Sequence, residues 1–564
     1  MATSQVLPSV CPLDWPETCS LSATIQDGRL VAVKGSRANP YTAGAVCEKV
    51  AKSYPESVHG DKRLTQPLVR TGARGSGEFR AVTWDETLDR IHADFSAAIA
   101  QHGPQSVLPF NYAGPYGQLA GGSMDRRFFH RLGASVLDRG PWCGAVRSGA
   151  YSALFGQSPG IMPEQAADAD VVAVWGNNAT VSNLHFQRIV QTARSRGAQL
   201  VVVDPKRTRI AVQAQLFVQI RPGTDVVLAM AAELERRGAF DQTFIERWVE
   251  GVDAFMAEAR QYTVAGVVRG CRVSAAQFSQ LVAIYAGAQR LAVAVGNGIE
   301  RGHSGGSGLR AIMSLNALLG QLGRLGRLGI RVIAKPNLAV PATSARLQRP
   351  DLIPPGTRTI NIVDVGQLLL DELLDIPIKA LFIYNHTPVC THLDQSSAKR
   401  TNATFGGGLD SAGVEVLEMH PHDAGARDIV EGDAVRVWNA LGEVELRATI
   451  SDAMQPGVVY SPKGMWLHSS STGQTVNALL SADIRTDIFD GACYHDTFAQ
   501  VEHLRAGLLW LWLPVLASAL QCLSARYCSR ARSLWHEYAD FFVETTVHGE
   551  PACLNNFRTQ RVLR

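Results

Sequence analysis

The sequence lacks an excess of charge of either sign. Its 54 lysines and arginines nearly balance 51 aspartates and glutamates, which leaves a formal net charge of +3. Nucleic acids and anionic membranes are bound by strongly basic surfaces, so this balance disfavours both as partners. Ten cysteines spread over 564 residues are too sparse for a disulfide scaffold, and we interpret most of them as buried small side chains.

Targeting signals and long apolar runs are scarce as well. The opening residues, MATSQVLPSV, hold no basic segment, no apolar segment and no twin arginine, so we infer no export signal and expect a cytoplasmic protein. The most apolar stretch, residues 508–520, is short for a bilayer and contains Pro514, which favours a buried or interfacial helix over a transmembrane segment. The dinucleotide fingerprint GxGxxG is also missing, which disfavours an NAD-dependent dehydrogenase.

What the sequence does contain is typical of a large multidomain α/β protein. Hydrophobic residues make up 46% of the chain and 51 residues are glycine, enough for a sizeable core and many tight loops. Apolar runs at 171–176, 199–204, 290–296 and 378–385 alternate with helical patterns. Such runs between helices predict doubly wound parallel sheets covered on both faces. Ligands of these sheets bind outside the carboxyl ends of the strands, so the loops that follow are the first place to seek a site.

The chain divides into four parts by pattern. Near the N-terminus, alternating apolar and polar residues around Asp27-Gly28 predict a tight β-hairpin. Short strands separated by glycine and proline predict a small β-barrel further on. We therefore expect a small N-terminal β domain at residues 1–62, α/β domains at 63–400, a β-barrel at 412–503 and a tail of unknown structure at 504–564.

Three cysteines in the first part have a suggestive spacing. Cys11, Cys19 and Cys47 form the pattern C-x7-C-x27-C beside the predicted hairpin. Three thiolates there suit an iron–sulfur or zinc site, and the alternative is that they are ordinary buried cysteines. A four-iron cluster normally takes four cysteines.

The segment CPLDWPETC, followed by DGRLVAVKGSRANPYTAGAVCEKV, resembles the opening of molybdopterin oxidoreductases of the DMSO reductase and formate dehydrogenase superfamily. The resemblance implies a molybdenum or tungsten ion bound by two molybdopterin guanine dinucleotides, and an N-terminal 4Fe–4S cluster. The family's second cysteine falls where this chain has Trp15. We expect a cluster with three ligands, no cluster, or a cluster completed by a non-cysteine ligand. Lys49 matches the family lysine between cluster and pterin, a cationic donor on the electron path.

The predicted loops resemble the family's cofactor loops in order and position. A guanine dinucleotide needs acceptors for its base, donors for its pyrophosphate and glycines that let the backbone approach. The candidate cofactor-binding residues are Gly176, Asn177, Asn178, Ser182 and His185; Asp204, Lys206, Arg207 and Thr208; Gly223, Thr224 and Asp225; Gly296, Asn297, Gly298 and His303; and Asn385. Each loop alone is a weak signal, and the five together carry the resemblance.

Cys143, in RGPWCGAVRSGAYSALFG, stands where the family places the metal ligand. A thiolate is a soft ligand that suits a metal already bound by dithiolenes. The alternative is a buried cysteine at a helix–loop junction. Gly144 stands where related formate dehydrogenases usually have histidine, which counts against formate as the substrate, and Arg147 is the candidate for holding an anion.

The predicted β-barrel resembles the double-psi barrel of the family. VEVLEMHPHDAGARDIVEGDAVRVWNALGEVELRATI matches its first half, and two later stretches match those that close over the pterins. The candidate contacts there are Gly464, Gln474, Asn477, Tyr494, His495 and Asp496.

The chain also departs from the family pattern. A block of more than a hundred residues that relatives usually carry is missing near residues 398–402, and the stretch after Glu502 matches nothing in the family. We predict a molybdopterin-dependent oxidoreductase that performs two-electron oxo or hydride-equivalent transfer on a small substrate. Electrons would leave through the N-terminal cluster to a redox partner protein or subunit. The alternative is an inactive or partly decayed relative that binds a pterin nucleotide or no cofactor.

Overall fold

The computed structural model describes most of the chain up to Leu504. The described residues are 3–13, 17, 19–61, 63–73, 76–112, 121–156, 160–221, 225–325, 341–370, 374–386, 388, 416–462, 470 and 473–504. Trp15, the block near 398–402, the apolar run at 508–520 and the rest of the tail lie outside them. None of the helices within these ranges combines the length and the apolar character that a bilayer span requires.

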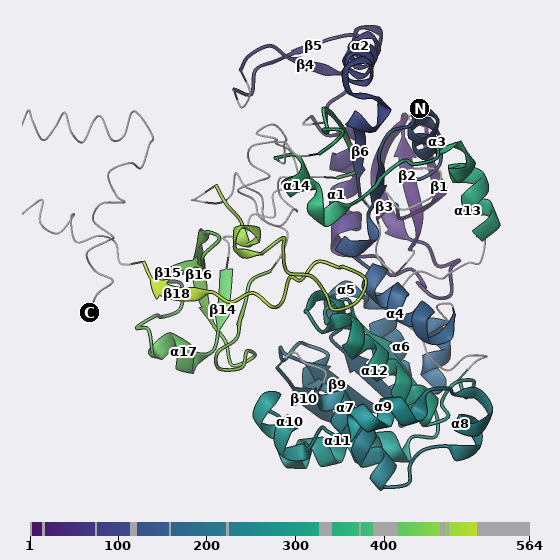
Figure 1. Ribbon diagram of the computed structural model, residues 1–564, viewed down its shortest axis with the longest axis vertical. Coiled ribbons are helices and arrows are strands. Elements are labelled where there is room, and N and C mark those ends of the chain that lie inside the picture. Colours follow the sequence, from purple (N-terminus) through teal and green to yellow (C-terminus); the bar gives the residue numbers. More distant parts are fainter. Residues whose placement is uncertain are drawn as a thin grey trace, which may run out of the picture. The chain divides into compact units, whose positions relative to one another are not determined.

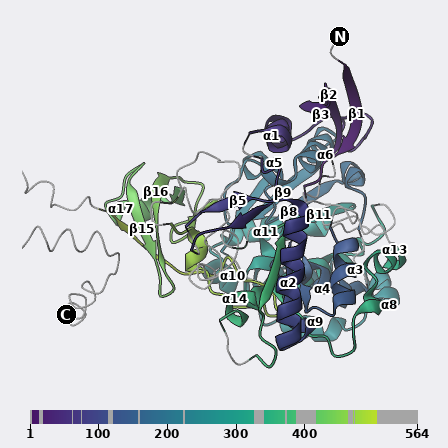
Figure 2. The same ribbon diagram turned by 90° about the horizontal axis from the view of Figure 1, so that it is seen from above.

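The N-terminal part is a three-stranded antiparallel sheet with one helix (Figure 2). Its elements are β1 (Ser4–Val10), β2 (Ser20–Gln26), β3 (Arg29–Gly35) and α1 (Glu48–His59). Asp27 and Gly28 join β2 to β3 with φ angles of 49° and 77°. Two positive φ angles define the two-residue turn that matches the twist of a hairpin. The predicted hairpin is therefore confirmed.

A four-stranded parallel sheet in the order β10-β9-β8-β11 forms the centre of the largest part (Figure 1). Its strands are β8 (Val171–Trp175), β9 (Gln199–Asp204), β10 (Leu216–Gln219) and β11 (Leu291–Val295). Its helices are α4 (Ala145–Phe155), α5 (Ala179–Ser182), α6 (Leu184–Ser195), α7 (Asp225–Arg236), α8 (Gln242–Trp248), α9 (Val252–Ala259), α10 (Val264–Gly270), α11 (Ala275–Gly287) and α12 (Gly305–Leu318). Three of the four strands expected from the sequence lie here.

Both faces of this sheet are buried, as the apolar runs predict. Successive side chains of a strand point to opposite faces. Ala173 and Trp175 of β8 therefore pack into the core shared with α7, α11 and α12, whereas Val172 and Val174 pack into the core shared with α6. The helix α11 begins at a capping box in which Ser274 and Gln277 satisfy each other's backbone amides.

A second α/β part is assembled from two separate stretches of the chain. Its strands are β6 (Val107–Asn111), β7 (Val136–Asp138), β12 (Thr359–Asn361) and β13 (Ala380–Tyr384), and its helices are α2 (Trp84–His102), α3 (Met124–Leu132), α13 (Pro341–Gln348) and α14 (Val365–Leu368). β13 pairs with β6 and β12 pairs with β7, both in parallel. The strand expected at 378–385 thus forms, but in this part. A short hairpin of β4 (Leu68–Arg70) and β5 (Phe79–Ala81) precedes α2.

The last described part is a five-stranded sheet in the order β17-β14-β16-β15-β18. Its elements are β14 (Val416–Met419), α17 (Pro421–Gly425), β15 (Ala434–Trp438), β16 (Glu443–Ile450), β17 (Val459–Tyr460) and β18 (Gln500–His503). Only β14 and β16 pair in parallel. Alternate residues of β15 and β16, such as Val435 and Val444, are buried in one small core. The predicted β structure of this region is confirmed, with one short helix, α17, between β14 and β15.

Candidate active site

The loops that follow β8 and β11 lie against each other. Gly176 adopts a φ of 53°, and its amide bonds the carbonyl of Val203 at 2.9 Å. The amide of Gly296 bonds the carbonyl of Trp175 at 2.8 Å. A Cβ atom on Gly296 would overlap the carbonyl oxygen of Gly176 and lie 2.7 Å from Cα of Asn177. Glycine at 296 is therefore what allows the two loops to meet at the carboxyl edge of the sheet.

Cys143 reaches this edge from another direction. It stands between the 3₁₀ turn Gly140–Trp142 and α4, and its side chain is partly exposed. Nδ2 of Asn297 lies 3.8 Å from its Sγ atom. The phenol of Tyr112 forms a side-chain hydrogen bond with Cys143, and burial together with the nearby thiol raises the pKa of Tyr112. The thiol thus sits where β6 and the loop after β11 come together.

Arg147 belongs to α4, the helix that begins just after Cys143, and is buried, with 6% of the residue exposed. Its Nη1 donates to the amide oxygen of Asn297 and lies 3.5 Å from Oε1 of Glu300. Its backbone amide also donates to Oε2 of Glu300 at 2.9 Å. Burial raises the pKa of Glu300, and the charges of Arg147 and Arg301 oppose that rise. Arg147 is thus engaged in holding Asn297 and Glu300.

Arg301 is a neighbour of Cys143 that the sequence analysis missed. Its guanidinium donates to the carbonyl of Trp142 and lies 4.8 Å from the ring centroid of Tyr494. Its own carbonyl accepts from the amide of Tyr494 at 2.9 Å and from that of His495 at 3.1 Å. Arg301 therefore ties the stretch around Tyr494 to the loop after β11. A lone arginine in the glycine-rich segment GNGIERGHSGG was the available signal.

The same C-terminal stretch holds the start of α12. Oδ2 of Asp496 accepts from the amide of His303, and the ring of His303 bonds the carbonyl of Arg485 at 2.8 Å. Asp487 accepts from the amide of Gly306 at 3.0 Å, one of the free amides at the N-terminus of the helix. His495 and His303 both take part in these loop contacts, since the ring of His495 bonds the carbonyl of Gly298 at 3.1 Å.

The loop after β9 combines a buried acid with basic residues. Asp204 accepts from the amide of Lys206 at 2.9 Å, and burial raises the pKa of Asp204 to about 6. Nζ of Lys206 bonds Glu418 at 2.6 Å. Arg207 pairs with Asp452 at 2.8 Å. Lys206 and Arg207 thus form ion pairs with Glu418 of β14 and with Asp452 in the turn after β16.

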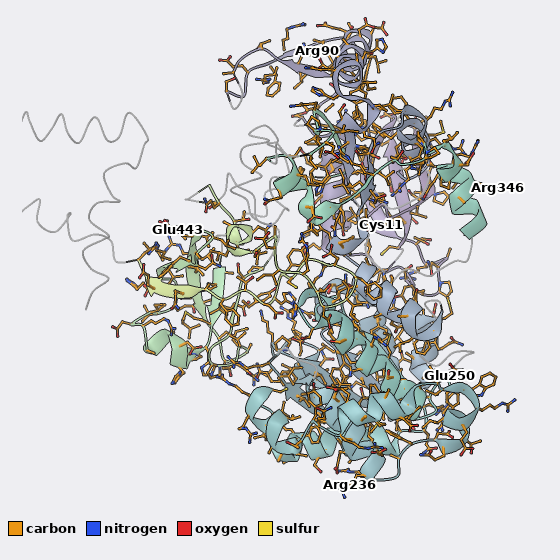
Figure 3. All side chains as sticks on the ribbon, viewed as in Figure 1. Cys11, Arg90, Arg236, Glu250, Arg346 and Glu443 are labelled. Atoms are coloured by element: carbon orange, nitrogen blue, oxygen red, sulfur yellow. The ribbon has the colours of Figure 1, made fainter. Side chains whose placement is uncertain are left out.

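The three N-terminal cysteines converge, and His185 joins them. Cys11, Cys19 and Cys47 border one small apolar cluster with Val33 and Val50, and Cys11 is labelled in Figure 3. Sγ of Cys19 lies 3.1 Å from Nε2 of His185. His185, although adjacent in sequence to the loop after β8, therefore contacts the cysteine cluster.

The remaining candidates are placed as follows. Ser182 donates to the carbonyl of Asn178 at 3.1 Å within the turn after β8, and Asn385 directly follows β13 with a φ of 53°. The backbone amide of Gln474 donates to Oγ of Ser470 at 3.2 Å, and Asn477 lies in the 3₁₀ turn Val476–Leu479. Gly223, Thr224, Gly464 and the side chains of Lys49 and Asp225 lie outside the described residues.

Comparison with known proteins identifies the family. The model of the molybdopterin oxidoreductase family matches residues 63–427, and that of the molydopterin dinucleotide binding domain matches residues 392–498. The chain belongs to the molybdopterin oxidoreductase family. This membership confirms the resemblance on which the predictions of the sequence rest, and the doubly wound α/β fold with it.

The matches to individual relatives cover only part of each relative's length. The chain is 35% identical over 392 residues to the probable oxidoreductase YoaE of Bacillus subtilis, covering 69% of this chain and 57% of that protein. It is 26% identical to the thiosulfate reductase molybdopterin-containing subunit PhsA of Salmonella typhimurium, covering 45% of this chain and 33% of that protein. The chain spans about half the length of the curated relatives it matches.

A solved structure shares the fold. Acetylene hydratase from Pelobacter acetylenicus superposes with a TM-score of 0.69 at 14% identity, over 88% of this chain and 99% of that chain. At this identity the likeness concerns the fold alone.

The pterin group of molybdopterin oxidoreductases fits the loops described above. Gly176 and Gly296 bring backbone atoms together at the sheet edge, and two buried side chains that follow β8 and β9 each have a polar atom without a partner among the described residues. Oγ1 of Thr208 and Oδ1 of Asn183 have no hydrogen-bond partner among the described residues. Buried polar atoms normally have partners, and a bound nucleotide would supply them.

The N-terminal segment, by contrast, does not fit the 4Fe–4S cluster of the family. The segment offers three thiols, because Trp15 stands at the fourth position. One of these thiols, Cys19, already contacts His185. A cluster bound by four thiolates therefore has no complete ligand set in this N-terminal segment.

Proposed function

We propose that this chain binds a molybdenum or tungsten pterin dinucleotide cofactor and performs two-electron oxo or hydride-equivalent transfer on a small substrate. The observation that carries the proposal is the set of residues that contact the thiol of Cys143. Its partly exposed thiol lies against Asn297 and Tyr112, at the edge where the loops after β8 and β11 meet. A soft thiolate at that edge suits a metal held by dithiolenes.

The residues around Cys143 take distinct roles in this proposal. When bound, the cofactor supplies the two-electron redox chemistry. Cys143 provides a metal ligand, and Tyr112 donates a hydrogen bond to it. Arg301, near both Tyr112 and Tyr494, supplies a fixed positive charge facing an anionic substrate. Arg147 positions Asn297, because its Nη1 donates to the amide oxygen of Asn297 and lies 3.5 Å from Glu300.

The cofactor would be held by the loops at the sheet edge. Asp204 is the acceptor proposed for the guanine base, and Gly176, Asn177, Gly296 and Gly298 allow the backbone to approach. We assign residues 63–400 to the molybdopterin-binding α/β domains and 412–503 to the dinucleotide-binding β domain. Residues 1–62 correspond to the family's iron–sulfur domain, and 504–564 to a tail. A partner protein or subunit is proposed to exchange electrons with the centre.

The test is elemental and pterin analysis of the chain purified anaerobically from a host that makes the cofactor. We expect about one molybdenum or tungsten per chain with released pterin. X-ray absorption at the metal edge then gives the number of sulfur ligands bound to the metal. Cys143→Ala is expected to lose one sulfur from the metal's shell while retaining pterin.

Cys271→Ala is the matched control. Cys271 directly follows α10 and its thiol is buried in the core, so its removal changes the cysteine count without changing the loops after β8 and β11. The sulfur shell should then be unchanged. If wild-type chain from such a host carries neither metal nor pterin, the alternative of a decayed relative takes the place of this proposal.

A further inference from the structure

Three potential ligands of different chemistry meet beneath the N-terminal sheet. Glu17 and Cys19 belong to the turn before β2, and His185 belongs to the first turn of α6. One donor atom from each lies within 4.8 Å of the other two. Sγ of Cys19 and Nε2 of His185 are 3.1 Å apart, and Nε2 lies 3.9 Å from Oε2 of Glu17. The donor atoms of a carboxylate, a thiol and an imidazole thus lie close enough together to surround one ion.

This spacing suits a single ion rather than a cluster. Zinc bonds to sulfur, nitrogen and oxygen are about 2.0–2.3 Å long, so donors around one tetrahedral ion lie about 3.3–3.6 Å apart. The distances of 3.1 and 3.9 Å bracket that range. In a 4Fe–4S cluster, by contrast, each thiolate binds a separate iron, and an imidazole beside one of the thiolates is not part of that arrangement.

The three groups are also buried and poorly compensated. The exposed fractions of Glu17, Cys19 and His185 are 5%, 6% and 1%. Nδ1 of His185 has no hydrogen-bond partner among the described residues. Buried polar groups of this kind are compensated when a divalent cation binds between them.

The backbone fixes this arrangement. Oε1 of Glu17 accepts from the amide of His185 at 2.9 Å, an amide left free at the start of α6. The amide of Cys11 bonds the carbonyl of Cys19 at 2.9 Å, which holds the cysteine turn closed. The carboxylate is thereby held beside the imidazole before any ion arrives.

We propose that Glu17, Cys19 and His185 bind one divalent metal ion, Zn²⁺ or Fe²⁺, in place of the family's cluster. A fourth tetrahedral position remains for Cys11 or a water molecule. Cys47 is not a ligand of this ion. The proposed ion joins the N-terminal part to α6 of the central α/β part, and the proposal holds whether or not the chain binds a pterin.

The experiment uses the full chain, stripped with a chelator under reducing conditions and titrated with Zn²⁺ against a chromophoric competitor. A parallel titration uses Co²⁺, whose visible bands report tetrahedral geometry and thiolate ligation directly. We expect about one ion per chain and a tetrahedral, thiolate-containing cobalt spectrum. Cys19→Ser and His185→Asn should each weaken Zn²⁺ binding by about 100-fold or more, since even outer-shell changes cost 10–100-fold.

Cys47→Ser separates the single ion from a cluster. It should bind Zn²⁺ as the wild type does, whereas a cluster on three thiolates would lose its metal in this variant. Several irons per chain with acid-labile sulfide, lost in Cys47→Ser and kept in His185→Asn, would overturn the proposal. So would a folded wild-type chain that takes up neither Zn²⁺ nor Co²⁺, because Glu17 would then serve only to cap α6. The cobalt spectrum of the unmutated chain decides even if a variant fails to fold.

Discussion

The guanidinium of Arg147 donates to the amide oxygen of Asn297, which leaves the amide nitrogen of Asn297 directed at Sγ of Cys143, 3.8 Å away. A buried cation in α4 therefore sets the orientation of a side chain beside the proposed metal ligand. Glu300 compensates that cation, with Oε1 3.5 Å from the same Nη1.

Arg147→Met should lower the free energy of unfolding by about 3–5 kcal/mol, because it leaves Glu300 as an unpaired buried charge. Urea denaturation followed by circular dichroism measures the change. Arg196→Met is the matched control, since Arg196 and Asp168 form an exposed pair worth about 0–1 kcal/mol. Adding Glu300→Gln to Arg147→Met should recover part of the loss. Equal effects at 147 and 196 would contradict the buried pair.

Gly296→Ala should push apart the loops after β8 and β11. The new Cβ would overlap the carbonyl of Gly176, a backbone atom that cannot move aside cheaply. We expect a loss of about 1–3 kcal/mol in stability and of pterin from the purified chain. Gly287→Ala, where a Cβ meets nothing within 4 Å, is the control and should keep both. Retention of pterin in Gly296→Ala would show that the close approach is not needed.

The stability of the chain should depend on pH through Asp204. Burial raises its folded-state pKa from the ordinary 3.8 to about 6, so the folded state holds the proton more tightly than the unfolded state. Its contribution to the unfolding free energy therefore falls as pH rises from about 4 to about 6, and is constant above that window. Asp204→Asn keeps the acceptor for Lys206 and cannot ionise.

Urea unfolding of wild type and Asp204→Asn across this window tests the sign. The variant should gain stability over the wild type as pH rises to about 6, and the difference should then level off. A difference that stays constant between pH 4 and 7 would mean that Asp204 does not titrate in this range.

Trp15→Cys should restore the four-thiolate pattern of the family. After anaerobic reconstitution with iron and sulfide, we expect about four irons per chain and the broad visible absorption of a cluster. The wild type treated in parallel should hold no such cluster. Adding Cys47→Ser to Trp15→Cys should abolish it again, and a cluster formed equally well by the wild type would show that Trp15 is no obstacle.

Local patterns were the predictable part of the structure. The hairpin at Asp27 and Gly28 and the strands β8, β9 and β11 follow from turn chemistry and from unbroken apolar runs. The pairing of β12 with β7 was not predicted, because residues 136 and 359 are brought together by contacts that no local pattern records. Sequence order likewise grouped His185 with the loop after β8, whereas the first turn of α6 directs it to Cys19.

The residues of the candidate site also divide into those that the sequence could predict and those that it could not. Cys143 and the glycines of the loops could be assigned from the family motif, since they occupy fixed positions in it. Arg301 and Glu17 could not, because a single charged residue in a loop has many possible partners. Their importance comes from burial and from contacts with residues more than a hundred positions away, such as Tyr494 and His185.

The return of β12 and β13 to β7 and β6 also bears on the order of folding. Closing these pairs joins residues separated by more than 200 positions, at an entropic cost that grows with the length of the intervening loop. The central sheet lies wholly within that loop and is built from nearer neighbours. It should therefore form first and shorten the effective loop, so the second α/β part completes late and is the stage most open to misfolding.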